Sequence, residues 1–313
     1  MTRTTAGGGD GDGEVRLLTL GIAPSTWRSN GNVTGLPPLN AHAAVQYNGR
    51  IFVSGGIPFT DTAHVYVATI NTATDHNLSN WMETTPMTGT RDAHGMVVVN
   101  NYMYVVGGYE GVTLAPTALY APITAGGVGS WSVASAPLPA PLAESATVVV
   151  NGRIYVLGGF SNSGTVATVY YAQPGGGGNI TSWNTATAPL PQPNEMLTAA
   201  VWNGAIYIIG GRGDTTPFYP NIYYAVPDSN TGDITSWVGP LTTLQNNLIL
   251  ASATTFAGQL YVAGGAFNNG QTLTNTIASN LIDPSRSFSL PWVNSDVLST
   301  PRQRAAAVMS NDG

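Results

Sequence analysis

A repeat of about 52 residues is the feature that most limits how this chain can fold. A Gly-Gly pair follows an apolar run five times, and the spacings between successive pairs are 52, 51, 52 and 54 residues. The pairs are Gly55-Gly56, Gly107-Gly108, Gly158-Gly159, Gly210-Gly211 and Gly264-Gly265. Six tryptophans keep nearly the same spacing, and a seventh, Trp202, lies outside it: the six are Trp27, Trp81, Trp131, Trp183, Trp237 and Trp292. Self-similarity at a fixed period of this length indicates a repeat architecture.

Each repeat carries the same order of strand signals. A run of small and β-branched residues leads into a two-residue turn, which is Asn-Gly in three repeats, for example Asn151-Gly152. Asn-Gly tolerates the positive φ angles that a tight hairpin needs. The next apolar run is nearly continuous, as in Ile206–Ile209, which is typical of a strand buried on both faces. A variable loop, a third strand and a fourth strand that begins at the phased tryptophan complete the repeat.

Four short antiparallel strands per repeat make one small sheet, and such a sheet can bury both faces when several pack radially around an axis. The six phased tryptophans predict six sheets. We expect five blades at about 41–92, 93–144, 145–196, 197–247 and 248–303. The sixth is expected from both ends of the chain, residues 15–40 plus 304–313. Residues 1–8 fall where its second strand belongs and are too polar for a buried strand, and residues 1–14 as a whole are expected to be a flexible Gly/Asp-rich segment.

The repeat pattern resembles the kelch family. In that pattern a tyrosine follows the Gly-Gly pair by ten to twelve residues and a tryptophan comes further on; here the tyrosines are Tyr66, Tyr120, Tyr170 and Tyr223. The fifth repeat departs from it, because Ile277 stands where tyrosine is expected. The resemblance runs from about residue 15 to the end and implies an all-β, six-bladed kelch-type β-propeller, four antiparallel strands per blade, with one blade closed by both termini. Kelch propellers include enzymes, adhesins and adaptors, so the fold alone does not give the function.

Composition excludes several classes of function. The 313 residues contain no Cys and no Lys, which removes disulfides, thiolate chemistry, Schiff-base lysines and the P-loop lysine. The net charge is −6 and no basic residues cluster, so we expect no nucleic-acid partner. The apolar runs are far shorter than the roughly 18 residues of a membrane helix, so we expect no membrane insertion. The uncharged polar surface favours an extracellular or cell-surface location, although compositional bias would give the same pattern; no signal peptide is recognised in this chain.

The loops between strands 2 and 3 and the connections from strand 4 to the next strand 1 are expected to share one face. The 2–3 loops are long, vary between blades and each carry an aromatic residue, and variable loops on a rigid scaffold are where ligands usually bind. The candidate ligand-binding residues are Arg91, His94, Tyr109, Phe160, Arg212, Asp214, Tyr219, Phe267 and Arg302. The alternative is that these rings pack the loops onto their own blades.

Catalytic and metal-binding signals are weak. Glu144 and Glu195 lie one repeat apart and could act as an acid/base pair with Arg91 nearby, or be ordinary solvated carboxylates. His42 and His94 are equivalent positions, but two histidines are too few for a metal site. Residues 10–14 alternate acidic side chains with glycine, as calcium loops do, but lack the later ligands of an EF-hand: the acidic residues are Asp10, Asp12 and Glu14. We expect no cofactor.

No known catalytic constellation appears in the sequence. Galactose-oxidase-like kelch enzymes need a Cys–Tyr crosslink, which is impossible here, and we find no sialidase Asp box and no G-x-S-x-G or H-E-x-x-H motif. The leading expectation is therefore a non-enzymatic, secreted or cell-surface binding module with a glycan or protein ligand, including adhesion. The alternatives are a carbohydrate-active enzyme, for which a six-bladed sialic-acid mutarotase is the nearest analogue in blade number, and a subunit of a larger surface assembly.

Overall fold

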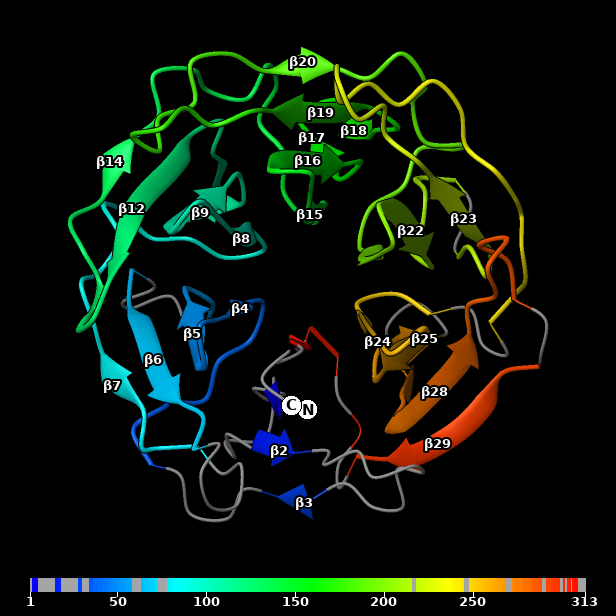
Figure 1. Ribbon diagram of the computed structural model, residues 1–313, viewed down its shortest axis with the longest axis horizontal. Coiled ribbons are helices and arrows are strands. Elements are labelled where there is room, and N and C mark those ends of the chain that lie inside the picture. Colours follow the sequence, from blue (N-terminus) through cyan, green and yellow to red (C-terminus); the bar gives the residue numbers. More distant parts are fainter. Residues whose placement is uncertain are drawn as a thin grey trace.

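The chain folds into sheets arranged around a central axis, an all-β propeller (Figure 1). The computed structural model describes residues 2–4, 15–17, 28–29, 34–57, 63–71, 78–215, 218–244, 248–267, 272–288, 291–298, 301, 303–304 and 306–308. Within these residues no helix is long and apolar enough to cross a membrane.

Five blades are built from antiparallel strands that follow one another from the axis to the rim. Blade 1 contains β4 (Ala43–Tyr47), β5 (Arg50–Ser54), β6 (Val65–Thr69) and β7 (Met82–Glu83). Blade 2 contains β8 (Gly95–Val99), β9 (Tyr102–Val106), β12 (Ala118–Thr124), β13 (Gly127–Val128) and β14 (Ser132–Val133). Blade 3 contains β15 (Ala146–Val150), β16 (Arg153–Leu157), β19 (Val169–Ala172) and β20 (Asn184–Thr185).

The fourth and fifth blades repeat the plan with small departures. Blade 4 contains β21 (Thr198–Trp202), β22 (Ala205–Ile209) and β23 (Ile222–Ala225), and two isolated bridges, Tyr224 to Val238 and Asn221 to Thr243, stand where a fourth strand is expected. Blade 5 contains β24 (Ser252–Phe256), β25 (Gln259–Ala263), β28 (Thr276–Leu281) and β29 (Val293–Val297). Three small hairpins fill loops between strands 2 and 3: β10–β11 (Tyr109–Glu110 and Thr113–Leu114), β17–β18 (Phe160–Ser161 and Gly164–Thr165), and β26–β27 (Ala266–Phe267 and Thr272–Leu273).

The predicted count of six blades is corrected to five. Between blades 1 and 5 lies a three-stranded sheet in the order β1 (Thr2–Thr4), β2 (Val15–Leu17), β3 (Arg28–Ser29) (Figure 1). Its strands have two or three residues, because the polar N-terminal sequence cannot supply the continuous apolar run that fills the second strand of the other blades. The predicted inner strand at 304–313 is not formed by residues 306–308, and 309–313 lie outside the described residues, as do 5–14.

The hydrophobic core lies between neighbouring blades. One cluster joins Val97 and Tyr104 of blade 2 to Ile154 and Val156 of blade 3, and equivalent clusters join the other neighbouring pairs from blade 1 to blade 5. The second strands are the most buried, as predicted, because each faces a neighbouring sheet on both sides.

The Gly-Gly pairs are required by close contact between blades. Gly107 has φ +65°, and a Cβ atom there would lie 2.4 Å from the carbonyl oxygen of Leu142 in the connection to blade 3. The N–H of Gly108 donates to that same carbonyl at 2.8 Å. Gly158 and Gly159 repeat both features with Asn194. A side chain at the first glycine would therefore push neighbouring blades apart.

A series of five backbone hydrogen bonds runs around the axis at one end of the first strands. Six residues at equivalent positions have positive φ between 49° and 56°: Ala41, Ala93, Glu144, Met196, Leu250 and Arg304. From Ala93 onward, the N–H of each donates to the carbonyl of the one before, at 2.8 to 3.1 Å. Arg304 is thus the sixth position of the ring, in the sector of the N-terminal sheet. We call these six residues the axial ring.

Candidate functional site at the mouth of the channel

The first strands line a central channel, and the axial ring marks one end of it. A cavity of about 230 Å³ at this end is lined by the axial ring and the residues that follow each member. Most of the lining side chains are small, such as Ala43, Gly95 and Ala146, and this leaves the axis open. The other half of the channel holds a larger cavity, with a volume of about 730 Å³. Trp202, the tryptophan outside the repeat, is among the residues that line it.

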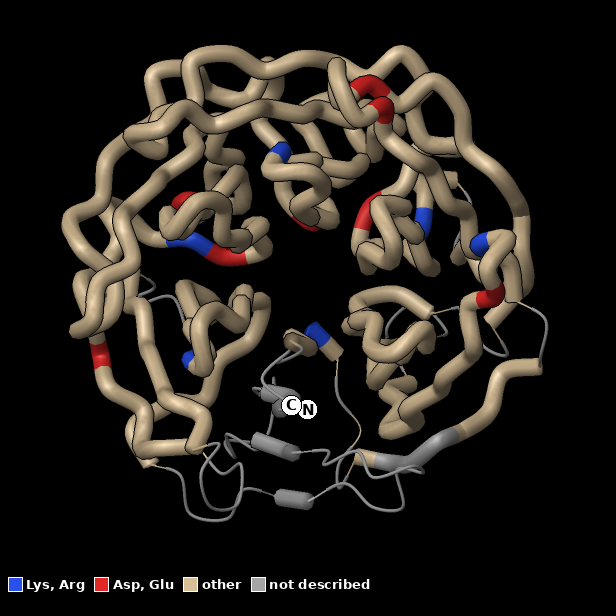
Figure 2. Tube along the Cα trace, in the orientation of Figure 1, with Lys and Arg blue, Asp and Glu red and all other residues tan. Residues whose placement is uncertain are grey.

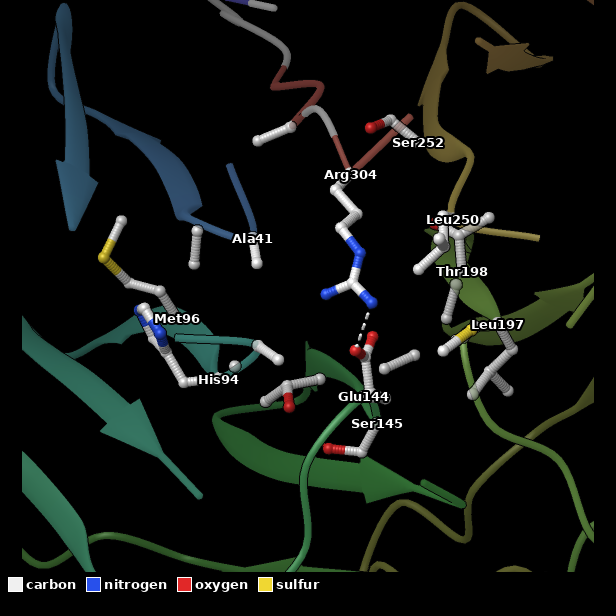
Figure 3. Close-up of a pocket in the computed structure, with 18 of the residues that line it drawn as sticks. Ala41, His94, Met96, Glu144, Ser145, Leu197, Thr198, Leu250, Ser252 and Arg304 are labelled. Carbon is white, nitrogen blue, oxygen red and sulfur yellow. Dashed lines mark ion pairs between the residues drawn. The ribbon is translucent and has the colours of Figure 1, made fainter. Parts of the chain in front are cut away.

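An ion pair crosses the mouth of the channel. Arg304 Nη2 lies 2.8 Å from Glu144 Oε1, and the two side chains are 23% and 11% exposed. Glu144 and Arg304 are the third and sixth members of the axial ring, so they stand on opposite sides of the axis, and the arginine reaches across to the carboxylate (Figure 3).

The two kinds of loop meet at this mouth. Backbone bridges tie Asp92 to Tyr109 and Glu195 to Arg212, joining each 4–1 connection to the residue after a Gly-Gly pair. The prediction that these loops share one face is therefore confirmed. Arg212 Nε also binds Glu195 Oε1 at 2.7 Å, and the Glu195 side chain is 6% exposed.

Charges at the mouth influence one another. Burial raises the pKa of Glu144, Arg304 lowers it, and the charges of Glu195 and Asp92 raise it further. Burial also raises the pKa of Asp92, against the field of Arg304. The pKa of the Tyr109 phenol is raised by burial and then by Glu144, Glu195 and Asp92, so all three carboxylates lie near this ring. The structure thus brings together Glu144, Glu195 and Tyr109 from the predicted set.

Arg91 does not join this group. Its side chain is 2% exposed and lies within the blade, where Nη1 is 3.0 Å from Glu110 and Nη2 donates to the Thr117 hydroxyl at 2.6 Å. Arg91 thus pairs with Glu110 of the hairpin β10–β11 and not with its neighbour Asp92.

Of the two buried histidines, His94 bonds to the neighbouring blade. His94 Nε2 lies 2.8 Å from the Ser54 hydroxyl of blade 1, and burial lowers its pKa to about 3, helped by the nearby Arg91 and His42. Burial lowers the pKa of His42 to about 4. No group of three or more potential metal ligands occurs in the described part of the chain.

Several predicted ligand-binding residues pack against the protein instead. Tyr219 is buried beneath Gly213, and Phe267 packs against the core between blades 4 and 5. Asp214 accepts hydrogen bonds from the N–H and hydroxyl of Thr165 in the neighbouring hairpin β17–β18. Phe160 is partly buried and bridges Ala143 through its backbone. The packing interpretation therefore accounts for the Tyr219 and Phe267 side chains, and a role of these residues in ligand binding stays a prediction.

Four predicted residues, Arg302, Asp10, Asp12 and Glu14, lie outside the described residues. The list of candidate ligand-binding residues did not include Asp92 and Arg304, although both lie in 4–1 connections. Their position in the repeat could have indicated them. Arg304 occupies the position equivalent to Glu144, and Asp92 directly precedes Ala93, another member of the axial ring.

Comparison with known proteins identifies the repeats. The family model for the KLHDC2/KLHL20/DRC7 Kelch-repeats domain matches residues 41–236, well over half of the chain. The chain belongs to the kelch-repeat family. Its kelch repeats are also similar in arrangement to the chain in the "Structure of YjhT", with a TM-score of 0.70 and 16% identity over 91% of both chains, a likeness that concerns the fold alone.

Curated kelch relatives share part of the sequence. Kelch-like protein terF of Aspergillus terreus is 30% identical over 207 residues, 60% of this chain and 43% of that protein. Beta-scruin of Limulus polyphemus is 34% identical over 130 residues, 40% of this chain and 14% of that protein. Kelch-like protein 35 of Mus musculus is 27% identical over 202 residues, 62% of this chain and 32% of that protein. The matched region spans less than half the length of each relative.

Proposed function

We propose that this kelch propeller is a non-enzymatic module that binds a protein ligand through the face that carries the 2–3 loops and 4–1 connections. The observation that carries the proposal is the gathering of ion-paired groups, Glu144–Arg304 and Glu195–Arg212, at the mouth of the channel. Charged residues are few in this chain, and several lie at the inner ends of the blades (Figure 2). Fixed charges on a rigid face are suited to recognise a partner with complementary charge.

The ion pairs also argue against a free catalytic carboxylate pair. A general acid or base must be able to reach its substrate with the proton it exchanges. Here each of the two glutamates is bound by an arginine at 2.7 or 2.8 Å, and the Arg304 side chain crosses the channel. These contacts favour recognition over proton transfer.

Selection of peptides from a random phage-display library on the purified chain tests the binding face. We expect selected peptides to lose affinity in the double variant Glu195→Ala/Arg212→Ala. They should keep it in Gln173→Ala, whose side chain bonds the Gly152 carbonyl in a 1–2 turn, at the opposite end of blade 3. Peptides that bind the loop-face variant as well as the unmodified chain would refute this binding face, and failure to select any peptide would oppose a protein ligand.

A glycan ligand at the same face, an adhesive role and a secreted or cell-surface location remain parts of the proposal that rest on the polar composition. A glycan array at controlled calcium concentration tests the first of them. No signal above background for any glycan would remove the carbohydrate version and leave the protein ligand.

We also propose that the N-terminal sheet and the segment around Arg304 complete a sixth blade. Supporting this, the Arg304 N–H continues the axial ring by donating to the Leu250 carbonyl at 3.0 Å. In hydrogen-exchange measurements, the Arg304 amide should then be about as well protected as the Met196 amide. Rapid exchange at Arg304 alone would contradict the proposed sixth blade. Membership in a larger assembly is tested separately by the mass of the purified particle in light scattering.

A carbohydrate-active enzyme is the second candidate, because Glu144 and Asp92 both have raised pKa values and lie near the Tyr109 phenol. A carboxyl that keeps its proton toward neutral pH can serve as an acid. Interconversion of sugar anomers followed by nuclear magnetic resonance would reveal this activity, and Glu144→Gln should abolish it. An anomer exchange rate equal to that of buffer would exclude this activity for the sugars tried.

A further inference from the structure

Asp92 is a largely buried residue whose carboxylate still reaches solvent and has no bonded counter-ion among the described residues. Its residue is 7% exposed, and no hydrogen bond or ion pair to its side chain occurs among the described residues. The adjacent Arg91 turns away to Glu110, and Arg304, whose charge reaches Asp92, is bonded to Glu144. Burying a carboxylate without a partner costs free energy, so an unpaired one in a folded protein calls for an explanation.

The surroundings of Asp92 carry an excess of negative charge. Three carboxylates act on the Tyr109 phenol, those of Glu144, Glu195 and Asp92. Two guanidinium groups, Arg212 and Arg304, oppose them, and each forms its ion pair with one carboxylate only. Among the residues that the structure describes, one carboxylate at the mouth is therefore left without a bonded cation.

We infer that the mouth of the channel receives a cationic side chain, arginine or lysine, of the protein ligand, and that Asp92 is its acceptor. The inference rests on the proposed protein-binding function and names the chemistry that the face selects. A ligand cation placed between Asp92 and Tyr109 would balance the local charge and supply the hydrogen bonds that Asp92 lacks. An acidic ligand would instead add a fourth negative charge to the cluster.

The side chain of Asp92 stays unpaired in the free protein, and this has a second consequence. A residue kept for binding at the expense of folding should be replaceable with a gain in stability. Asp92→Asn keeps the shape and removes the charge, so this variant should melt at a higher temperature than the unmodified chain while it binds its ligand more weakly.

The experiment uses the peptides selected on the purified full chain and reads two quantities. The consensus should contain a conserved Arg or Lys, and its replacement by citrulline or glutamine should weaken binding at least tenfold in calorimetric titration. Asp92→Asn should weaken binding of the parent peptide to a similar extent and should not weaken binding of the neutral peptide further. Glu83→Gln is the matched control, because it makes the same charge change at the outer strand β7 and should leave affinity unchanged.

The outcomes separate the two claims. Selected peptides that lack a basic residue, or that bind Asp92→Asn as tightly as the unmodified chain, overturn the inference and leave the binding function standing. Equal weakening by Glu83→Gln would also overturn it, because the effect would then come from the net charge of the protein. No selected peptide at all defeats the proposed function on which the inference rests.

Discussion

At the scale of single residues, the first glycine of each pair matters because of what stands opposite it. Four of these glycines have φ between 59° and 65°, and a Cβ atom on each would come within 2.4 Å of a backbone carbonyl oxygen of the next blade. A side-chain neighbour could rotate away, but a carbonyl held in a hydrogen bond cannot. The close contact between blades therefore requires the Gly-Gly pair, and the strand that the pair ends does not.

Gly107→Ala is expected to destabilise the fold by about 3 kcal/mol, since it adds the cost of a left-handed alanine to a clash with the Leu142 carbonyl. Gly126→Ala is the control, because a Cβ atom there would meet nothing within 4 Å. Urea unfolding followed by tryptophan fluorescence measures both. Equal midpoints would mean that the blades can separate without cost.

Because His42 and His94 are buried, we expect the free energy of unfolding to depend on pH in the acidic range. Their folded pKa values, about 4 for His42 and about 3 for His94, lie below the ordinary value of 6.5, so the unfolded chain takes up protons first. Stability is complete above pH 6.5 and is lost as the pH falls toward 4 and 3, by up to about 1.4 kcal/mol per pH unit for each histidine.

Unfolding free energies at pH 7, 6 and 5 measure this slope. The double variant His42→Gln/His94→Gln should show a smaller loss over the same range, whatever its stability at pH 7. Carboxylates titrate in both proteins and cancel in the difference. Identical slopes would show that the histidines are not buried in their neutral form.

At the scale of elements, blades are joined by side chains that reach a neighbour's backbone. The indole N–H groups of Trp131 and Trp183 donate to carbonyls of the preceding blades, those of Thr85 and Ala136. On the second strands, the Tyr104 and Tyr155 hydroxyls donate to the following blades, at Gly178 and Gly232. The phased tryptophans that revealed the repeat are thus contacts between repeats.

Trp131→Phe should cost about 1 kcal/mol more than Trp292→Phe, because both remove similar buried area but only Trp131 loses a hydrogen bond. The Trp292 indole N–H finds no acceptor among the described residues. Thermal unfolding monitored by circular dichroism compares the two variants. A larger loss of stability for Trp292→Phe would argue that packing, rather than the hydrogen bond to Thr85, determines how much the phased tryptophans stabilise the fold.

The sequence predicts a strand well where residues close together in the chain determine it. The two-residue turns, which are Asn-Gly in three blades, and the continuous apolar runs locate the first and second strands of all five blades, because hairpin geometry and burial on both faces act within a few residues. The outer strands have two residues in three blades, and in blade 4 two isolated bridges stand in place of the outer strand. Their extent depends on packing against a neighbour, which the tryptophan alone does not determine.

At the scale of the whole molecule, the arrangement of the axial ring determines which side chains come into contact at the mouth of the channel. Glu144 and Arg304 are 160 positions apart in the sequence, yet their side chains form an ion pair across the channel. The sequence nominated Glu144 with Glu195 because they occupy neighbouring repeats. It could not show that the partner of Glu144 comes from the opposite repeat, because this depends on how many positions the ring has.

A double-mutant cycle with Glu144→Gln and Arg304→Met measures the contact across the axis. We expect a coupling free energy of about 1 to 2 kcal/mol, since both side chains are largely buried and each single variant leaves one charge unpaired. Urea unfolding of the four proteins gives the value. Additive effects would show that the pair contributes nothing to closure of the channel.

The five bonds of the axial ring are all alike, a left-handed residue donating to the one before it. A bond of this kind carries no information about how many units follow, so a repeat could be gained or lost by duplication without disturbing any single junction. The Glu144–Arg304 pair is different in kind, because it joins the third of these positions to the sixth across the channel rather than along the chain of bonds. This one contact ties the chemistry of the mouth to how the separate repeats are placed around the axis.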